Sequence, residues 1–302
     1  MRETPVEPSD VLGALGNCTV HLKCENFQRT GSFKFRGAIS KILALSEAER
    51  SRGVVTASTG NHGLAVSLAA RLLGIPATIY HPVDASKTKL EGIGALGATP
   101  VAFGEDCVLC EGEARAHVQR EGLAYVSPYN DIQVAAGQGT LAVELSRQLD
   151  GVDAVFVSVG GGGLISGVGA FLKQWQPHVQ VYGCSPVNSA VMLHSLASED
   201  LLEMTSLPTL SDGTAGGVEA GSITHGYCQS LIDHPVFVSE AEIAEAMRLV
   251  IGRHHMLVEG AAGAAVAGFL QKAPELKGKR VVIVLCGANL GVETLREVLC
   301  VS

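Results

Sequence analysis

One lysine stands in a setting that could make it chemically reactive. Lys34 lies between Phe33 and Phe35 within the glycine-bounded stretch Gly31–Ala38, which leads into a segment of helical spacing. The flanking aromatic rings indicate that the stem of this lysine is buried. Desolvation lowers the pKa of an amine, and a neutral amine is the nucleophile that Schiff-base chemistry needs. The plainer alternative is a lysine with a buried stem and a solvated charge.

Two strand-to-helix loops have the composition of anion-binding sites. Residues 58–63 read Ser-Thr-Gly-Asn-His-Gly, which combines two hydroxyls, an amide and the free N–H groups of a helix start. Residues 160–163 are four glycines followed by Leu164. Such a run is entropically costly, and it is useful where backbone N–H groups must approach a phosphate closely. An ordinary helix start needs one capping residue, so a ligand role is favoured for both loops.

The chemistry of the glycine run narrows the choice of ligand. No Gly-Lys-Ser/Thr follows it, which excludes a P-loop. A dinucleotide site would place an acid at the end of the next strand, where the sequence reads Tyr182–Ser185. A monophosphate therefore fits better, and together with a Schiff-base lysine it implies pyridoxal phosphate. A third loop, Leu285–Asn289, contains Cys286, which taken alone is most simply a core thiol.

The composition favours a folded, soluble cytoplasmic protein. The chain has 302 residues, 47% hydrophobic and 17% charged, with a net charge of −8 and no basic run. This composition argues against nucleic-acid and anionic-membrane partners. We expect no membrane segment and no secretion signal, and we interpret the eight cysteines as reduced thiols.

Short apolar strands alternate with helix-period segments, which predicts an α/β fold with parallel sheets. The expected strands are 54–57, 77–80, 99–102, 124–126, 154–157, 179–182, 235–238 and 280–285. The expected helices are 61–73, 87–96, 107–120, 132–148, 164–173, 187–196, 240–253 and 291–299. Residues 50–135 are expected to form a smaller lobe, and residues 1–49 with 136–302 a larger one.

The motifs, taken in order, resemble those of one family. The four motifs are, in chain order, Gly-Ser-Phe-Lys-Phe-Arg-Gly-Ala, Ser-Thr-Gly-Asn-His-Gly, the tetraglycine and Cys-Gly-Ala-Asn. This order resembles that of the serine/threonine dehydratase and serine racemase family, whose members are fold-type-II pyridoxal-phosphate enzymes. The resemblance covers essentially the whole chain. It implies two open parallel-sheet α/β lobes, a large one that binds the cofactor and a small one on the substrate side. It also implies a homodimer.

The resemblance implies roles for individual residues around the cofactor. Lys34 would form the Schiff base and, once freed, remove the Cα proton. Phe33 would pack against the pyridine ring, and Asn61 would hydrogen-bond the phenolic oxygen. Cys286 would face the pyridine nitrogen, and because a neutral thiol does not hold this nitrogen protonated, β-elimination is favoured over longer-lived carbanions. Glu259 would lie close to the cofactor or simply cap the following alanine-rich helix.

The remaining roles belong to the two anion-binding loops. The phosphate would be held by Gly160, Gly161, Gly162, Gly163 and Leu164. The substrate carboxylate would be held by the loop that contains Ser58, Thr59, Gly60, Asn61 and His62.

Two departures from the family pattern matter for function. Metal-dependent racemases carry a glutamate and, six residues later, an aspartate, where this chain has Ser185 and Val191. We therefore expect no Mg²⁺ or Ca²⁺ at that position. Racemases place a serine, and many dehydratases an alanine, where this chain has Thr59. Threonine keeps the hydroxyl but is stiffer at χ1, so racemisation is possible without being favoured.

The leading functional prediction is dehydration and deamination of a β-hydroxy amino acid, L-serine or L-threonine, to a 2-oxo acid and ammonia. The alternatives are a serine racemase and an ammonia-lyase for 3-hydroxyaspartate or a hydroxyectoine-derived amino acid, the last because of the stretch Asp212–Gly217. His62 argues against the β-replacement chemistry of cysteine synthase. A non-catalytic amino-acid sensor is a third class.

The pair Cys107 and Cys110 has CxxC spacing without a second pair to complete a zinc site.

Overall fold

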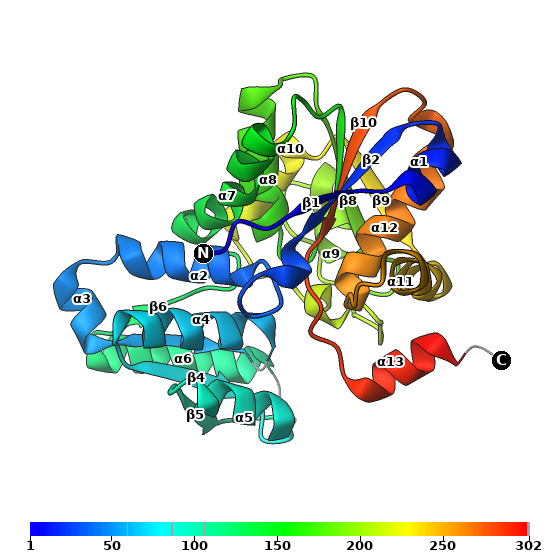
Figure 1. The fold of residues 1–302 in the computed structure, drawn as a ribbon. Helices are drawn as coiled ribbons and strands as arrows, with labels where there is room; N and C mark the ends of the chain where they lie inside the picture. Colours follow the sequence, from blue (N-terminus) through cyan, green and yellow to red (C-terminus); the bar gives the residue numbers. More distant parts are fainter. Residues whose placement is uncertain (59, 86, 106, 301–302) are drawn as a thin grey trace. The chain divides into compact units, whose positions relative to one another are not determined.

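A computed structural model describes residues 1–58, 60–85, 87–105 and 107–300, apart from the side chains of residues 87–89 and 107. The chain divides into two compact units (Figure 1). One contains Arg2–Phe33 and Gly139–Ser302, and the other contains Met1 and Lys34–Gln138. The expected lobe boundary differs from this division over residues 34–49 and 136–138, which belong to the smaller unit. The physical reason is that the helix formed there, α2 (Lys34–Ala44), packs against α4 (Asn61–Leu73).

The smaller unit is built on a parallel sheet in the order β5-β4-β3-β6. The expected strands are confirmed here, with ends that differ by no more than one residue: β3 (Val54–Ala57), β4 (Ala77–His81), β5 (Thr99–Ala102) and β6 (Ala124–Tyr125). Its helices also include α3 (Glu47–Arg52), α5 (Lys87–Ala95) and α6 (Cys107–Glu121), while α7 (Ile132–Gln148) begins in this unit and ends in the larger one. The strand-to-helix loops after β3 and β6 carry the polar residues discussed below.

The larger unit contains a second sheet, in the order β1-β2-β10-β7-β8-β9. Its strands are β1 (Val6–Pro8), β2 (Thr19–Cys24), β7 (Ala154–Ser158), β8 (Gln180–Pro186), β9 (His234–Val238) and β10 (Arg280–Leu285). The expectation of a parallel sheet is confirmed, with one exception at the edge, where β1 runs antiparallel to β2. Neither strand was predicted, since the polar residues in β2 and the brevity of β1 obscure the strand pattern.

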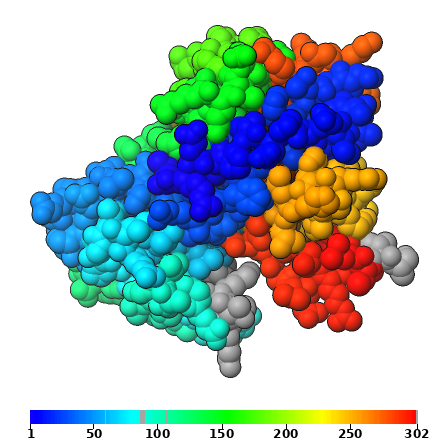
Figure 2. Space-filling model, viewed as in Figure 1, coloured from blue at the N-terminus to red at the C-terminus, as the bar shows by residue number. Residues whose placement is uncertain are grey.

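Helices of the larger unit enclose this sheet. They are α1 (Asp10–Gly16), α8 (Gly163–Trp175), α9 (Val191–His194), α10 (Ile223–Leu231), α11 (Glu240–His254), α12 (Gly260–Lys272) and α13 (Val292–Leu299). The alanine- and glycine-rich helix α12 packs against β7, β8 and β10, and its small side chains allow a close approach to the sheet. Figure 2 shows α13, in red, at the surface beside the orange atoms of the preceding helices, and α13 contacts α11.

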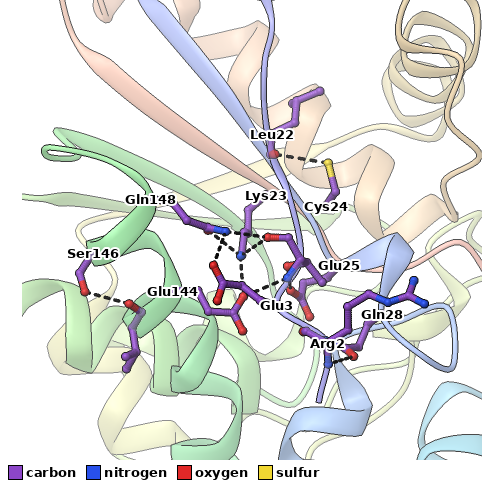
Figure 3. A network of polar contacts seen from close by, with 12 residues as sticks. Arg2, Glu3, Leu22, Lys23, Cys24, Glu25, Gln28, Glu144, Ser146 and Gln148 are labelled. Atoms are coloured by element: carbon purple, nitrogen blue, oxygen red, sulfur yellow. Dashed lines mark hydrogen bonds and ion pairs between the residues drawn. The ribbon is translucent and has the colours of Figure 1, made fainter.

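A buried ion pair ties the N-terminal segment to the larger unit (Figure 3). The Lys23 side chain has no exposed surface, and its Nζ lies 2.6 Å from Glu144 Oε2. The same ammonium donates to the Thr4 carbonyl at 2.8 Å and to Gln148 Oε1 at 2.9 Å. Three oxygen acceptors for three N–H donors satisfy the charge. This network fixes residues 2–4 against β2 and α7, although no local sequence pattern indicates it.

Two further observations concern the surface and the thiols. Among the described residues, no helix is both long enough and apolar enough to cross a membrane. The cysteines described as free thiols are Cys18, Cys24, Cys110, Cys184, Cys228, Cys286 and Cys300. Most of these are buried, and they belong to two of the three hydrophobic core clusters among the described residues.

Candidate active site

Two neighbouring strands of the larger sheet end in side chains that touch. Ser158 is the last residue of β7, and Cys286 directly follows β10. The two strands pair in parallel, so their carboxyl ends meet at the same edge of the sheet. Ser158 Oγ lies 3.4 Å from Cys286 Sγ, and both residues are buried. A thiol and a hydroxyl therefore lie where open α/β sheets bind their ligands.

The residues just before Lys34 are held at this same edge. The Phe33 N–H donates to the Cys286 carbonyl at 3.0 Å, and Ser32 forms an antiparallel bridge with Gly287. Gly31 adopts a φ of +72°, which lets the chain turn into this short pairing. The structure thus brings together Phe33 and Cys286, two residues predicted to contact the same cofactor ring. Lys34 is the next residue along the chain.

The glycine loop lies between β7 and α8 in the same unit. Gly162 has a φ of +82° and caps α8 without any side-chain hydrogen bond. A Cβ at Gly160 would lie 2.7 Å from the carbonyl oxygen of Thr214 and 2.8 Å from its Cα, so only glycine fits. The loop follows β7 and therefore presents the N-terminal N–H groups of α8 at the edge that carries Cys286. Free N–H groups and the helix dipole make this a site for an anion such as a phosphate.

Glu259 supports the turn that follows Cys286. Its N–H donates to the Gly287 carbonyl at 3.0 Å, and its Oε2 accepts from the Asn289 N–H at 3.0 Å. A Cβ on Gly287 would lie 2.6 Å from the carboxylate, so the turn packs directly on this acid. The carboxylate does not cap α12, since Glu259 makes no side-chain cap bond. Glu259 therefore stabilises the turn that follows Cys286. That Glu259 lies close to the cofactor stays a prediction.

Lys34 is the first residue of α2. Its Nζ donates to the Pro128 carbonyl at 2.9 Å. Pro128 belongs to a loop between β6 and α7 that sequence reasoning missed. In this loop Ser127 Oγ accepts from the Asn130 N–H at 2.9 Å, and Asp131 Oδ1 accepts from the Gln133 N–H at 2.7 Å. The available signal was turn chemistry, Ser-Pro followed by Asn-Asp, directly after a short strand.

The loop from Ser58 to Asn61 leads from β3 into α4. Gly60 is the N-cap residue and makes no side-chain cap bond, and its N–H donates to Ser58 Oγ at 3.2 Å. Asn61 opens the helix, so the N–H groups of its first turn lie in the same loop. This geometry supports an anion site of the kind predicted for a carboxylate. Thr59 lies outside the described residues, so its predicted catalytic role stays a prediction.

His62 has a role that the sequence did not reveal. Its ring is buried, and Nε2 donates to the Val126 carbonyl at 2.9 Å. Burial, followed by the positive charge of Lys34, lowers the pKa of His62 to about 3. The imidazole is therefore neutral at physiological pH and cannot offer a positive charge to a carboxylate.

The predicted site residues form two groups, one in each unit. The larger unit holds Phe33, Gly160, Gly161, Gly162, Gly163, Leu164, Glu259 and Cys286, and the smaller unit holds Lys34, Ser58, Gly60, Asn61 and His62. The peptide bond between Phe33 and Lys34 joins the groups. Each group by itself fits a part of pyridoxal phosphate: the glycine loop, where a Cβ at Gly160 or Gly162 would meet neighbouring atoms, suits its phosphate, and a lysine amine suits its aldehyde.

The region of the metal-dependent motif holds a different arrangement. Ser185 is buried, and its hydroxyl donates to the Val159 carbonyl at 2.7 Å. Val191 is buried and apolar. Within the described part of the chain, no group of three or more His, Cys, Asp or Glu residues could hold a metal ion. At the two positions where the metal motif has carboxylates, this chain thus has a hydrogen-bonded serine and a buried valine.

Comparison with known proteins assigns the family. The chain is 40% identical over 301 residues to the L-threonine ammonia-lyase of Thermotoga maritima, covering 99% of this chain and 74% of that enzyme. It is 34% identical over 291 residues to the serine racemase of Schizosaccharomyces pombe, covering 96% and 90%. The processed form of threonine deaminase isoform 2 from Solanum lycopersicum superposes with a TM-score of 0.93 at 34% identity, covering 98% and 87%.

The family described as pyridoxal-phosphate dependent enzymes matches residues 1–287. That range includes the lysine, the glycine loop and the thiol described above. The chain belongs to the family of pyridoxal-phosphate dependent enzymes.

Proposed function

We propose that this enzyme is an ammonia-lyase that removes water from a β-hydroxy amino acid such as L-serine or L-threonine. The substrate loses its Cα proton and its β-hydroxyl as water, and hydrolysis of the resulting enamine gives a 2-oxo acid and ammonia. The hydrogen bond from the Phe33 N–H to the Cys286 carbonyl carries this proposal. It fixes the chain one residue before Lys34 at the sheet edge that holds the thiol and the glycine loop.

Lys34 provides the base. Pyridoxal phosphate, when bound, supplies an aldehyde for amine exchange and a conjugated ring that accepts the electron pair left at Cα. The Lys34 amine, released by the incoming amino acid, takes the Cα proton. The Pro128 carbonyl, which accepts from Nζ at 2.9 Å, keeps the amine in place and stabilises it once protonated.

The other residues orient and bind. In the larger unit, the N–H groups of Gly160–Leu164 would hold the cofactor phosphate, and Phe33 would pack on the ring. In the smaller unit, the N–H groups of the loop containing Ser58 and Asn61 hold the substrate carboxylate. Cys286 would face the ring nitrogen, and a ring beside a thiol would withdraw electrons less strongly than one held protonated by a carboxylate. Prompt departure of the β-hydroxyl suits such a ring.

The assembly is a second part of the proposal. We propose a homodimer that works in the cytoplasm, supported by the family resemblance and by the free thiols among the described residues. Light scattering coupled to gel filtration tests the assembly, with twice the chain mass of 31.4 kDa as the expected result.

The activity is tested with a panel of amino acids. The protein is loaded with pyridoxal phosphate and supplied with L-serine, L-threonine or L-threo-3-hydroxyaspartate, and both 2-oxo acid and ammonia are measured. We expect equimolar products from serine or threonine, and no product from Lys34→Ala. Lys173→Ala is the matched control, because this lysine ion-pairs with Asp233 and lies in the last turn of α8. Product formed by Lys34→Ala would contradict the proposal.

Chiral analysis of the same reactions in D₂O separates the alternatives. D-Serine labelled at Cα and formed faster than pyruvate would identify a racemase. Turnover confined to 3-hydroxyaspartate would identify an ammonia-lyase for that dicarboxylate. Cofactor loading without turnover of any amino acid would favour a sensor.

A further inference from the structure

Two buried hydroxyls at the start of α10 form a chain of hydrogen bonds that ends on the glycine loop. Thr224 Oγ1 lies 2.6 Å from the Gly161 carbonyl oxygen and 2.7 Å from Ser222 Oγ. We propose that Thr224 is a positioning residue for the phosphate: its hydroxyl fixes the peptide that joins Gly161 to Gly162, and Ser222 reinforces it. The inference rests on the proposed function, in which the N–H groups of this loop hold the cofactor phosphate.

The direction of both hydrogen bonds follows from the groups that form them. A carbonyl oxygen can only accept, so the single proton of the Thr224 hydroxyl is donated to Gly161. The Ser222 hydroxyl must then be the donor to Thr224 Oγ1. Ser222 is the N-cap residue of α10, yet its side chain makes no cap hydrogen bond. A residue type that usually caps a helix therefore supports the glycine loop instead.

The bond to the Gly161 carbonyl determines where the next N–H points. In a trans peptide the C=O and the N–H point in opposite directions, and this peptide is trans. With its carbonyl held by Thr224, the N–H of Gly162 points away from Thr224. Glycine restricts its backbone dihedrals very little, so a run of four glycines needs an outside contact to keep one orientation. The Thr224 hydroxyl is such a contact.

The side of the loop that faces α10 is filled by side chains. Thr224 has no exposed surface, and Ser222 is 5% exposed, so water does not replace their contacts. A Cβ at Gly162 would lie 2.7 Å from Cys228 Sγ and 3.1 Å from Thr224 Cβ, so α10 packs directly on the loop. Gly161 itself is partly exposed. An anion must therefore approach the loop from a side other than that of α10.

The hydroxyl chain also strengthens the donor. Hydrogen bonds in a chain polarise one another, so a peptide whose carbonyl accepts a bond has an N–H that donates better. Ser222 adds to this effect by donating to Thr224. In this arrangement Thr224 touches neither the cofactor nor the substrate and acts through the Gly161–Gly162 peptide. Its loss should weaken the binding of the phosphate group and leave the contacts to the rest of the cofactor intact.

The test compares two ligands that differ only in the phosphate. The dissociation constants of the apoprotein for pyridoxal phosphate and for pyridoxal are measured by equilibrium titration, and the ratio of the second to the first is the phosphate preference. Thr224→Val replaces the hydroxyl by a methyl group of similar size. It should lower the preference about tenfold, the loss expected when one N–H no longer meets an anion. Thr224→Ser keeps a hydroxyl and should restore the preference.

A second readout reports on the phosphate itself. The ³¹P resonance of bound pyridoxal phosphate should move in Thr224→Val and return to its wild-type position in Thr224→Ser. Ser222→Ala keeps the Thr224 hydroxyl and should move the resonance less; it also carries the test if Thr224→Val does not fold. Ser9→Ala removes a buried hydroxyl at the start of α1 in the same unit, and should change neither readout.

The outcomes separate this inference from the proposed function. If Thr224→Val and Ser222→Ala keep both the wild-type preference and the wild-type resonance, the inference is overturned while the proposed function stands. Equal losses of affinity for pyridoxal phosphate and pyridoxal in Thr224→Val would overturn it too, because they would show a purely structural role. If the wild type binds pyridoxal as tightly as pyridoxal phosphate, the role of the glycine loop in the proposed function fails as well.

Discussion

The buried imidazole of His62 makes the stability of the smaller unit depend on pH. Its pKa is lowered from 6.5 to about 3 by burial and then by the charge of Lys34. A second proton would reside on Nδ1, which is buried without a hydrogen-bond partner. Between these two pKa values the unfolded chain binds a proton at His62 that the folded chain does not. The free energy of unfolding therefore falls as the pH drops below the unfolded value and is unaffected above it.

The size of this effect follows from the shift. Acidification from about pH 7.5 to about pH 5.5 should remove about 1.4 kcal/mol of unfolding free energy through His62 alone. His62→Gln removes the titrating group and retains a side-chain N–H that can donate to the Val126 carbonyl. The pH-dependent loss should thus be about 1.4 kcal/mol smaller in His62→Gln than in wild type, even if the variant is less stable at every pH.

Urea unfolding followed by far-UV circular dichroism at both pH values measures this difference. The single tryptophan, Trp175, lies in α8 of the larger unit, so its fluorescence is an internal control that should show no dependence on His62. The reasoning is refuted if both proteins lose equal stability on acidification. It is also refuted if the imidazole of His62 titrates near pH 6.5 by NMR.

Three further outcomes are expected. Gly160→Ala should weaken pyridoxal phosphate binding at least tenfold, as measured by equilibrium titration, because the added Cβ would meet the Thr214 backbone. The control Gly252→Ala, in α11, adds a Cβ in open space and should bind the cofactor as wild type does. Lys23→Met should lower the free energy of unfolding by about 3–5 kcal/mol, because it removes the fully buried ammonium that pairs with the largely buried Glu144 carboxylate. Tryptophan fluorescence in urea measures this, and a loss below about 1 kcal/mol would contradict the assignment. Activity should survive EDTA, since Ser185 donates to a carbonyl where a metal motif would place a carboxylate; a loss reversed by Mg²⁺ would contradict this.

Local patterns predicted much of the fold. The strand at 54–57 and the helix at 61–73 are confirmed at both ends, because alternation of buried apolar runs with capped helices is a local signal. The N-terminal pair β1 and β2 escaped prediction because β2 contains Lys23, whose charge is satisfied only by distant Glu144. The lobe boundary differed for a similar reason, since nothing within residues 34–49 indicates packing against α4.

The candidate site was likewise predicted only in part from the sequence. The glycine loop and Lys34 were found because their residue types are unusual at their positions. The Pro128 carbonyl, which accepts from Lys34, was missed because any residue has a carbonyl and only the fold selects one. The neighbours Ser158 and Cys286 lie far apart in the sequence and become adjacent through the pairing of β7 with β10. Contacts of this kind depend on topology, which a local pattern does not contain.

The central claim is that Lys34 carries the cofactor. Borohydride reduction of the protein loaded with pyridoxal phosphate, followed by proteolysis and mass spectrometry, identifies the modified lysine, since reduction makes a Schiff base permanent. We predict a single pyridoxyl group on Lys34. Modification of another lysine in its place, or a loaded protein with no modified lysine, would contradict the account.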